Sequence, residues 1–328
     1  MIKLGYQIPN FSYEGVDRVD LFENVAAQAL TAEASGFDTV LMMDHFYQLP
    51  MIGQPEDWML ECYSVLSALA ARTSTIRLSA LVSGNTYRNP AMLAKVITSL
   101  DVISRGRAIC GIGCGWFELE HESLGFEFGT FGERFEKLDE ALQIITAMFR
   151  DERPSLDGKY YRVKEAINQP PPVQDGGVPI MIGGSGEKKT LRMVAQYAQE
   201  SNLTCGPDEF ARKFEALDAH CAALGRDRSE IEVTWLTALL LAPTMDEANK
   251  LRDDYFQSQG IDWHSLDEAT QGAMSARMLI GDPDSVAEQV QSKALDRGIS
   301  GITLNMMPNG HNLDILALAG ETLSPLVN

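Results

Sequence analysis

The chain has 328 residues, of which 45% are hydrophobic and 22% charged, so its composition is that of a folded globular protein and not of a disordered one. Its 27 Lys and Arg against 46 Asp and Glu give a net charge of −19, which argues against binding to nucleic acid or to an anionic membrane surface. No apolar run approaches the roughly 20 residues that span a bilayer, and the N-terminus lacks a signal segment. The five cysteines are odd in number, as is usual for reduced thiols. We therefore expect a cytoplasmic protein.

Short apolar runs alternate with segments of helical periodicity along the whole chain. Eight of these runs are predicted strands, and their lack of a polar–apolar alternation is typical of parallel strands buried on both faces. The predicted strands are residues 4–8, 39–43, 76–82, 108–113, 179–182, 201–204, 231–240 and 299–306. Eight strand–helix units favour a (β/α)8 TIM barrel formed by a single domain over residues 1–328, with an open doubly wound sheet as the alternative.

Several of the intervening helices have clear boundary residues. The predicted boundaries are Asn89-Pro90 after the third strand, Pro207 and Gly225 after the sixth, and Asp282-Pro283 and Gly298 before the eighth. Two long connections, residues 115–134 after the fourth strand and 253–281 after the seventh, are predicted as insertions. Both follow carboxyl ends of strands, the end of a barrel where enzymes build their active sites.

Three glycines lie between the fifth predicted strand and the next helix, in the run Ile180–Thr190 (IMIGGSGEKKT). Glycine lets the backbone approach an anion closely, and the N–H groups at a helix N-terminus point at it. Lys188, Lys189 and Arg192 lie in the predicted first turns of that helix. The pattern predicts a phosphate-binding loop, with a tight strand–helix turn as the structural alternative.

A second glycine cluster, Gly111-Ile112-Gly113-Cys114-Gly115-Trp116, ends the fourth predicted strand, and no helix is predicted directly after it. Alternate glycines at a strand end provide a surface without side chains on which a planar ring can lie. The structural alternative is a barrel position that is crowded by its neighbours. We favour the ring-binding interpretation.

Asp44 and His45 follow the second predicted strand. An acid and an imidazole at the carboxyl end of a barrel strand can act as a hydrogen-bond partner and a proton donor. The alternative is a capping or surface pair. No two histidines have a metal-ligand spacing and no Cys-x-x-Cys occurs, so no metal site is expected.

These clusters, in this order, resemble the luciferase-like monooxygenase superfamily, and in particular its branch that uses the deazaflavin coenzyme F420. The matching segments cover most of the first two-thirds of the chain: residues 43–46, 77–95, 100–121, 132–135, 158–161, 170–173 and 179–188. The resemblance implies a (β/α)8 barrel with the cofactor ring at its carboxyl-terminal mouth. It also implies a non-prolyl cis peptide bond behind the ring, at Leu81–Val82.

The resemblance assigns a set of cofactor-binding residues: Asp44, Leu81, Val82, Gly113, Cys114 and Gly115 for the ring, and Gly183, Gly184, Ser185, Gly186 and Lys188 for the phosphate. Lys188, Lys189 and Arg192 are candidates to hold either the phosphate or the acidic tail of the deazaflavin. Two positions depart from the family pattern. Sugar-phosphate dehydrogenases of the family have a glutamate where this chain has Trp116, so oxidation of glucose 6-phosphate is not expected. Ser185 stands where close relatives often have glycine.

The resemblance therefore predicts an F420-dependent oxidoreductase, similar to dimeric relatives, that moves a hydride between C5 of the deazaflavin and an unidentified small organic substrate. His45 and Asp44 are the first candidates for catalytic residues, and Glu118 and His121 the second. Tyr87, Trp116 and the insertion 253–281 are expected to shape the pocket. The alternatives are an FMN-dependent monooxygenase that uses reduced flavin and O2, a non-catalytic flavin-binding barrel, and an unrelated phosphate-binding barrel such as an aldolase.

Overall fold

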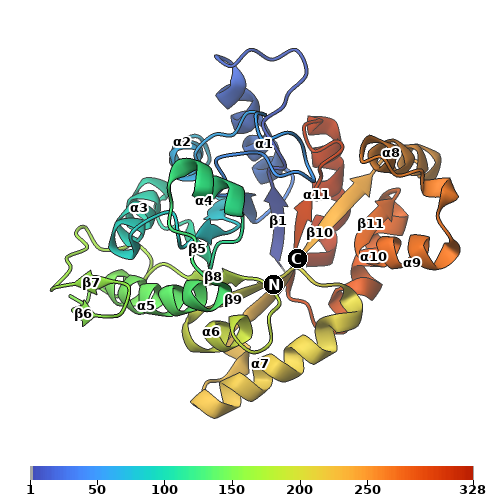
Figure 1. The fold of residues 1–328 in the computed structure, drawn as a ribbon. Helices are drawn as coiled ribbons and strands as arrows, with labels where there is room; N and C mark the ends of the chain where they lie inside the picture. Colours follow the sequence, from blue (N-terminus) through green and yellow to red (C-terminus); the bar gives the residue numbers. More distant parts are fainter. Residues whose placement is uncertain (1–2, 328) are drawn as a thin grey trace.

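Eight parallel strands form a closed barrel in the computed structural model, which describes residues 3–327 (Figure 1). In their order around the ring they are β1 (Lys3–Gln7), β2 (Thr39–Met42), β3 (Arg77–Ala80), β5 (Ala108–Gly113), β8 (Ile180–Gly183), β9 (Glu200–Leu203), β10 (Glu232–Leu241) and β12 (Gly301–Asn305). The last strand pairs with the first, which closes the ring and excludes the open sheet. All eight predicted strands are present, and no predicted end differs from the observed one by more than two residues.

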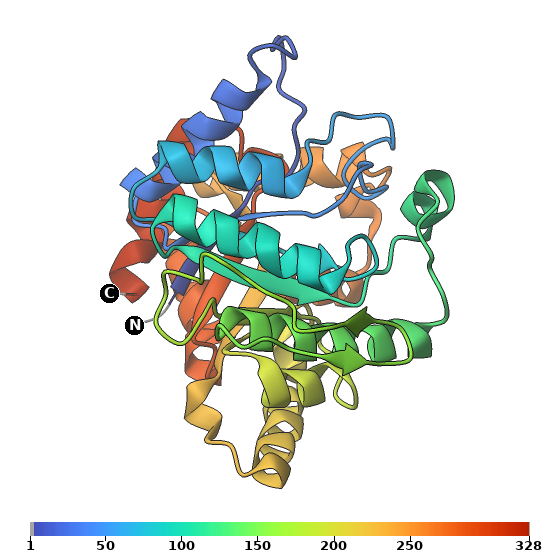
Figure 2. The same ribbon diagram turned by 90° about the vertical axis from the view of Figure 1, so that its left-hand side faces the viewer.

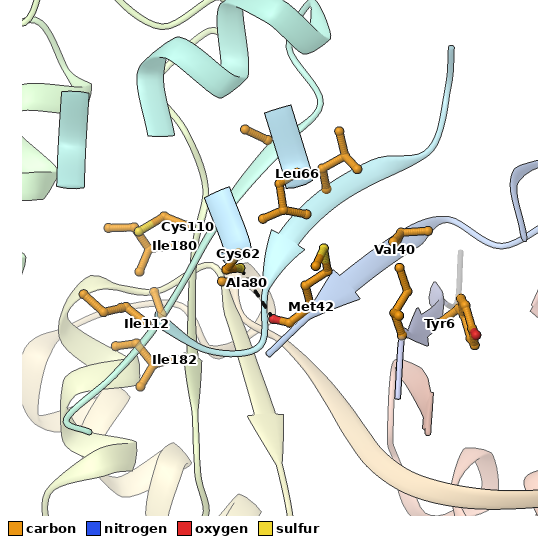
Figure 3. Close-up of a cluster of buried hydrophobic side chains, with 14 of the residues drawn as sticks. Tyr6, Val40, Met42, Cys62, Leu66, Ala80, Cys110, Ile112, Ile180 and Ile182 are labelled. Atoms are coloured by element: carbon orange, nitrogen blue, oxygen red, sulfur yellow. Dashed lines mark hydrogen bonds between the residues drawn. The ribbon is translucent and has the colours of Figure 1, made fainter. Parts of the chain in front are cut away.

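Both faces of the barrel wall are buried, because successive side chains point alternately inward and outward. Leu41, Ile109 and Met181 pack together inside the ring. Their neighbours along the strands face the helices. Figure 3 shows part of this outer layer, with side chains from β2, β3, β5 and β8 and from α2 (Cys62–Arg72): Val40, Met42, Ala80, Cys110, Ile112, Ile180, Ile182, Cys62 and Leu66. Burial on both sides explains why the strands read as continuous apolar runs.

A layer of helices surrounds the barrel (Figures 1 and 2). Besides α2 it contains α1 (Leu21–Ala34), α3 (Pro90–Ser104), α5 (Phe131–Phe149), α6 (Thr190–Tyr197), α7 (Phe210–Leu224), α10 (Pro283–Lys293) and α11 (Leu313–Val327). The predicted boundary at Asn89 is confirmed, since its side chain accepts hydrogen bonds from the N–H groups of Ala91 and Met92. Gly225 ends α7 with φ +66°, as predicted. No helix within residues 3–327 combines the length and the apolar character that crossing a membrane requires.

Two predicted boundaries are corrected. Pro207 begins a short 3-10 turn (Pro207–Glu209), and α7 starts only after it. The last long helix, α10, ends at Lys293, and Gly298 instead ends a separate 3-10 turn (Leu295–Arg297).

The two insertions are more regular than the sequence indicates. The first contains α4 (Glu118–Leu124), so the expectation that no helix follows the glycine cluster was wrong; Figure 2 shows α4 set apart from the layer of α2, α3 and α5. The second contains the end of α8 (Met245–Ser258), then α9 (Glu268–Ala276) and β11 (Met278–Gly281), a strand that pairs with β10 outside the ring. The short strands β4 (Ser83–Gly84), β6 (Leu156–Asp157) and β7 (Arg162–Val163) complete the elements.

Candidate active site

A cavity of about 500 Å³ lies at the carboxyl ends of the barrel strands, and its size is typical of sites for small molecules and cofactors. Its walls include residues at, near or just after the carboxyl ends of all eight barrel strands. The predicted site residues in its lining are Asp44, His45, Leu81, Val82, Gly115, Gly183 and Gly184, together with Tyr87, Trp116 and Arg277. The closed ring thus brings together residues from three predicted clusters that lie far apart in the sequence.

His45 is oriented by the buried carboxylate of Glu120. Its Nδ1 lies 2.9 Å from Glu120 Oε2, while Glu120 Oε1 accepts hydrogen bonds from the N–H groups of Phe46 and Tyr47. Burial opposes the charged form of Glu120, but the hydrogen bonds from His45, Tyr87 and Tyr47 outweigh it and lower the pKa of this carboxyl. A carboxylate only accepts hydrogen bonds, so Nδ1 carries the proton and donates. Nε2 is then the nitrogen that can take up or release a proton.

Aromatic side chains surround this pair. The Tyr87 hydroxyl donates to Glu120 Oε2 at 2.5 Å, and the Tyr87 side chain also lines the cavity. The Trp116 ring meets the His45 ring edge-on, with 5.6 Å between the centroids, and remains largely exposed. The expectation that Tyr87 and Trp116 shape the cavity wall is in agreement with these positions.

Asp44 forms a buried ion pair with Arg88. Arg88 Nη1 lies 2.6 Å from Oδ2 of Asp44 and Nη2 lies 2.9 Å from Oδ1, while Nη2 also bonds Glu61 at 2.7 Å. Asp44 is only 2% exposed. Burial raises the pKa of the Asp44 carboxyl, and the contact with Arg88 opposes that shift. Both carboxylate oxygens of Asp44 accept hydrogen bonds from Arg88, so this side chain is a fixed part of the cavity wall and is not a free acid.

The peptide bond Leu81–Val82 is cis, as the resemblance implies, and both residues line the cavity. The Val82 side chain explains why two neighbouring positions, Gly113 and Gly183, are glycine. A Cβ added at Gly113 would lie 2.9 Å from Val82 Cγ2, and one added at Gly183 would lie 2.9 Å from Val82 Cγ1. Such distances are too short for ordinary packing, so glycine at both positions makes room for Val82.

For two of its glycines, the second cluster fits the structural alternative, a barrel position that is crowded by its neighbours. A Cβ at Gly111 would overlap the carbonyl oxygen of Ala80, and Gly113 faces Val82. Neither glycine lines the cavity, and crowding inside the barrel wall accounts for both. Only Gly115, with φ +79°, reaches the cavity.

The predicted phosphate loop begins at the cavity and leads away from it. Gly184 has φ +117° and donates its N–H to the Asn202 carbonyl oxygen at 2.9 Å. The N–H groups of Ser185 and Gly186 have no hydrogen-bond acceptor among residues 3–327 and are available to an anion. The helix starts later than predicted, because α6 begins at Thr190.

The lysines therefore precede α6 instead of lying within it. The Lys188 side chain is exposed and does not line the cavity. Lys189 Nζ lies 5.6 and 5.3 Å from the ring centroids of Phe131 and Phe135, on the α5 side of the loop. Neither lysine is positioned at the cavity wall itself.

Two predicted catalytic residues lie outside the cavity. Glu118 is exposed on α4. His121 is buried with both ring nitrogens engaged: Nδ1 donates to the Phe117 carbonyl oxygen at 2.7 Å, and Nε2 lies 2.7 Å from the Thr86 hydroxyl. Cys114 is half-buried and also absent from the lining. Of the four predicted catalytic residues, Asp44 and His45 line the cavity, and Glu118 and His121 do not.

Sequence reasoning missed three polar residues of the site. Glu120 gave no signal, because α4 is too short to show a helical apolar pattern. Asn202 and Asn305 line the cavity, and the Oδ1 atom of each is buried without a partner among residues 3–327. Their Nδ2 atoms donate to Thr234 Oγ1 at 2.9 Å and to Gln7 Oε1 at 2.7 Å, respectively. For Asn305 the detectable signal was an amide side chain near the end of a largely apolar predicted strand, whereas the predicted strand of Asn202, Ser-Asn-Leu-Thr, offers no such contrast.

Comparisons with known proteins extend the match beyond these motifs. The model of the luciferase-like monooxygenase family matches residues 2–300. The F420-dependent glucose-6-phosphate dehydrogenase of Microbacterium testaceum is 30% identical over 290 residues, which cover 85% of this chain and 79% of that protein. The EDTA monooxygenase of a Chelativorans species superposes with a TM-score of 0.84 at 18% identity, covering 99% and 93% of the two chains. The F420-dependent tetrahydromethanopterin reductase of Methanopyrus kandleri gives 0.78 at 20% identity, covering 100% and 99%.

Proposed function

Because the chain belongs to the luciferase-like monooxygenase family, we propose that it is an oxidoreductase that uses coenzyme F420 to transfer a hydride to or from a small organic substrate. One observation carries the proposal: His45, with its tautomer set by Glu120, lines the same cavity as the glycine pair Gly183-Gly184. A proton-exchanging imidazole and the start of the glycine loop, whose free N–H groups belong to the next two residues, thus lie at one cavity. The choice of F420 is supported by the name of the Microbacterium testaceum relative.

The residues present fit a deazaflavin. The cavity has mainly apolar walls, which suit a flat tricyclic ring. The unpartnered Oδ1 atoms of Asn202 and Asn305 would accept hydrogen bonds from the N–H of the ring or from hydroxyls of its side chain, and burial without such a partner is unfavourable. The free N–H groups of Ser185 and Gly186 would hold the phosphate.

When bound, the deazaflavin supplies the hydride chemistry at C5, and the chain supplies orientation and proton transfer. His45 Nε2 would take the proton of a substrate hydroxyl in the oxidative direction and return it to a carbonyl in the reductive direction. Glu120 would stabilise the imidazolium that forms, because its negative charge lies 2.9 Å from Nδ1. Trp116 and Tyr87 would limit the access of water to this nitrogen.

A binding titration tests the cofactor, and a turnover assay tests the chemistry. We expect oxidised F420 to bind the whole chain and to be reduced by secondary alcohols, or its reduced form to be reoxidised by ketones, enones or imines, without consumption of O2. The variant His45→Ala should keep F420 affinity and lose turnover by about 10²–10⁴-fold. Failure to bind F420 would refute the choice of cofactor. Tight binding of FMN with stoichiometric O2 consumption would support the monooxygenase alternative. Unchanged turnover in His45→Ala would remove the imidazole from the mechanism.

The finer properties of the protein are further parts of the proposal. We propose a single domain that acts as a homodimer in the cytoplasm and binds neither nucleic acid nor membranes, in keeping with the net charge of −19. We also propose that glucose 6-phosphate is not the substrate, since Trp116 stands where the sugar-phosphate dehydrogenases of the family have a glutamate. Glucose 6-phosphate belongs in the substrate panel as the arm that tests this point.

A further inference from the structure

A second cavity of about 380 Å³ adjoins the site described above. Met51, Ile52 and Met307 line both cavities, so these three side chains form the partition between them. The second cavity lies between the loop after β2, the end of α8 and the loop after β12. Its far side is formed by exposed residues near the end of α8, so it opens toward solvent.

The two cavities differ in chemical character. The first has mostly apolar walls, with His45 at one side. The second combines the apolar partition with polar side chains at its outer end: Asn10, Asp254, Ser258 and Gln259. Asp254 is the one charged residue in this lining, and it is paired with Lys250 on the same helix at 2.5 Å. No Lys, Arg or His lines the second cavity, so it offers no site for a phosphate or a carboxylate.

We propose that the second cavity is a distal subsite for the substrate, and that the substrate is an elongated, uncharged molecule. Its reacting carbon would lie near His45, its apolar middle would pass the partition, and a hydroxyl or amide at its far end would bond the polar side chains at the end of α8. The inference rests on the proposed function for the position of the reacting carbon. It goes further by naming the class of substrate and the residues that select for length.

The partition is made of side chains that can move. Met51 and Met307 are unbranched and have three rotatable bonds, so they adapt their shape to an occupant at low cost. Met51 is 59% exposed, and Met307 contacts the α8 side through its Sδ, 3.9 Å from the Tyr255 hydroxyl. Methionines at this point are suited to let an apolar chain pass between the two cavities.

Binding of methyl ketones of increasing chain length tests the proposal by calorimetry, with and without F420. In the native protein, affinity should rise about fourfold for each added methylene, and the rise should continue beyond the chains that fill the first cavity. In Met307→Trp and in Met51→Trp, which enlarge the partition, the rise should stop at shorter chains, so the ratio of long-chain to short-chain affinity should fall. A terminal hydroxyl on the long ketones should keep or improve affinity, and a terminal carboxylate should weaken it several-fold beside Asp254.

Leu224→Trp provides the control, because Leu224 is an exposed apolar residue on α7 and lines neither cavity. It should leave the chain-length series unchanged. The proposal would be overturned if affinity stopped rising at the same chain length in the native protein and in both partition variants. It would also be overturned if affinity in the native protein stopped rising once the ketone filled the first cavity. If the native protein did not bind F420, the proposed function would be refuted. The ketone series measured without F420 would still decide whether the distal subsite exists.

Discussion

Glu120 Oε2 lies 2.9 Å from Nδ1 of His45, although the two residues are 75 positions apart in the sequence. His45 follows β2 and Glu120 lies on α4, which follows β5. The Glu120 side chain has no exposed surface, and it also accepts hydrogen bonds from the backbone N–H groups of the two residues after His45. One buried carboxylate thereby fixes both the backbone after β2 and the tautomer of the imidazole.

The variant Glu120→Gln tests this arrangement. Its side-chain amide would present an N–H to His45 Nδ1, so Nδ1 would have to accept and Nε2 would carry the proton. We expect the rate of hydride transfer to fall by about 10²–10⁴-fold with little change in F420 affinity. Stopped-flow measurement of F420 reduction gives the rate, and nitrogen NMR of His45 reports the tautomer directly.

Glu118→Gln is the matched control, since Glu118 lies two positions away on the same helix with its side chain exposed. It should leave both the rate and the His45 spectrum unchanged. If Glu120→Gln retained native turnover with an inverted tautomer, the role assigned to Nε2 would be incorrect.

The pH dependence of stability should identify Glu120 as a charged group in the folded state. Its pKa is lowered in the fold from the ordinary value of 4.5, so it stabilises the native protein above that pH and loses this contribution as the pH falls through the lower, folded pKa. The difference in unfolding free energy between the native protein and Glu120→Gln should therefore be largest near neutral pH and shrink below about pH 4.5. Urea titrations over that range measure it, and a difference that stays constant into the acid range would contradict the assignment.

Removal of Arg88 should be costly because Asp44 is buried. Arg88→Met would leave a 2% exposed carboxylate without its partner, which typically costs about 3–5 kcal/mol of unfolding free energy. Asp44→Asn in the same chain should restore part of that loss. Chemical denaturation provides the values.

The surface pair of Arg72 and Glu23 is the control for Arg88, because it has the same two-bond geometry at 2.9 and 2.9 Å but is exposed. Arg72→Met should cost less than about 1 kcal/mol. Equal losses in the two variants would mean that burial of Asp44 does not determine the cost.

The crowding around Val82 predicts an energetic coupling between Val82 and each of two glycines that are distant in the sequence. Gly113→Ala and Gly183→Ala should each cost about 1–3 kcal/mol, because each new methyl group would lie 2.9 Å from a Val82 methyl group. In a Val82→Ala background most of that cost should disappear. Thermal or urea unfolding of the six chains (the native protein, the three single variants and the two double variants) measures the coupling.

Gly272→Ala serves as its control, since Gly272 lies within α9 with open space where a Cβ would be added. That change should be neutral or stabilise the protein by about 0.5–1 kcal/mol. Costs at Gly113 and Gly183 that persist without the Val82 side chain would show that the backbone, and not this contact, requires glycine.

Much of the fold was predictable because local patterns encode it. Apolar runs mark the strands, and residues such as Asn89 and Gly225 mark helix ends, since their side-chain or backbone preferences act over a few neighbouring positions. Short elements such as α4 and β11 were not predicted, because seven and four residues are too few to show a period. The glycine-containing turn after β8 was located, but the start of α6 was placed too early.

The sequence by itself determined the barrel, the cis bond implied at Leu81–Val82 and the position of His45 at the carboxyl end of a strand, because each depends on short-range patterns or family motifs. Only the tertiary structure decided that Glu120, and not Glu118 or His121, faces His45, and that Gly113 accommodates Val82. These contacts join residues that only the closure of the ring brings together. Which of several neighbouring side chains points inward is set by packing across the barrel, and no local pattern records it.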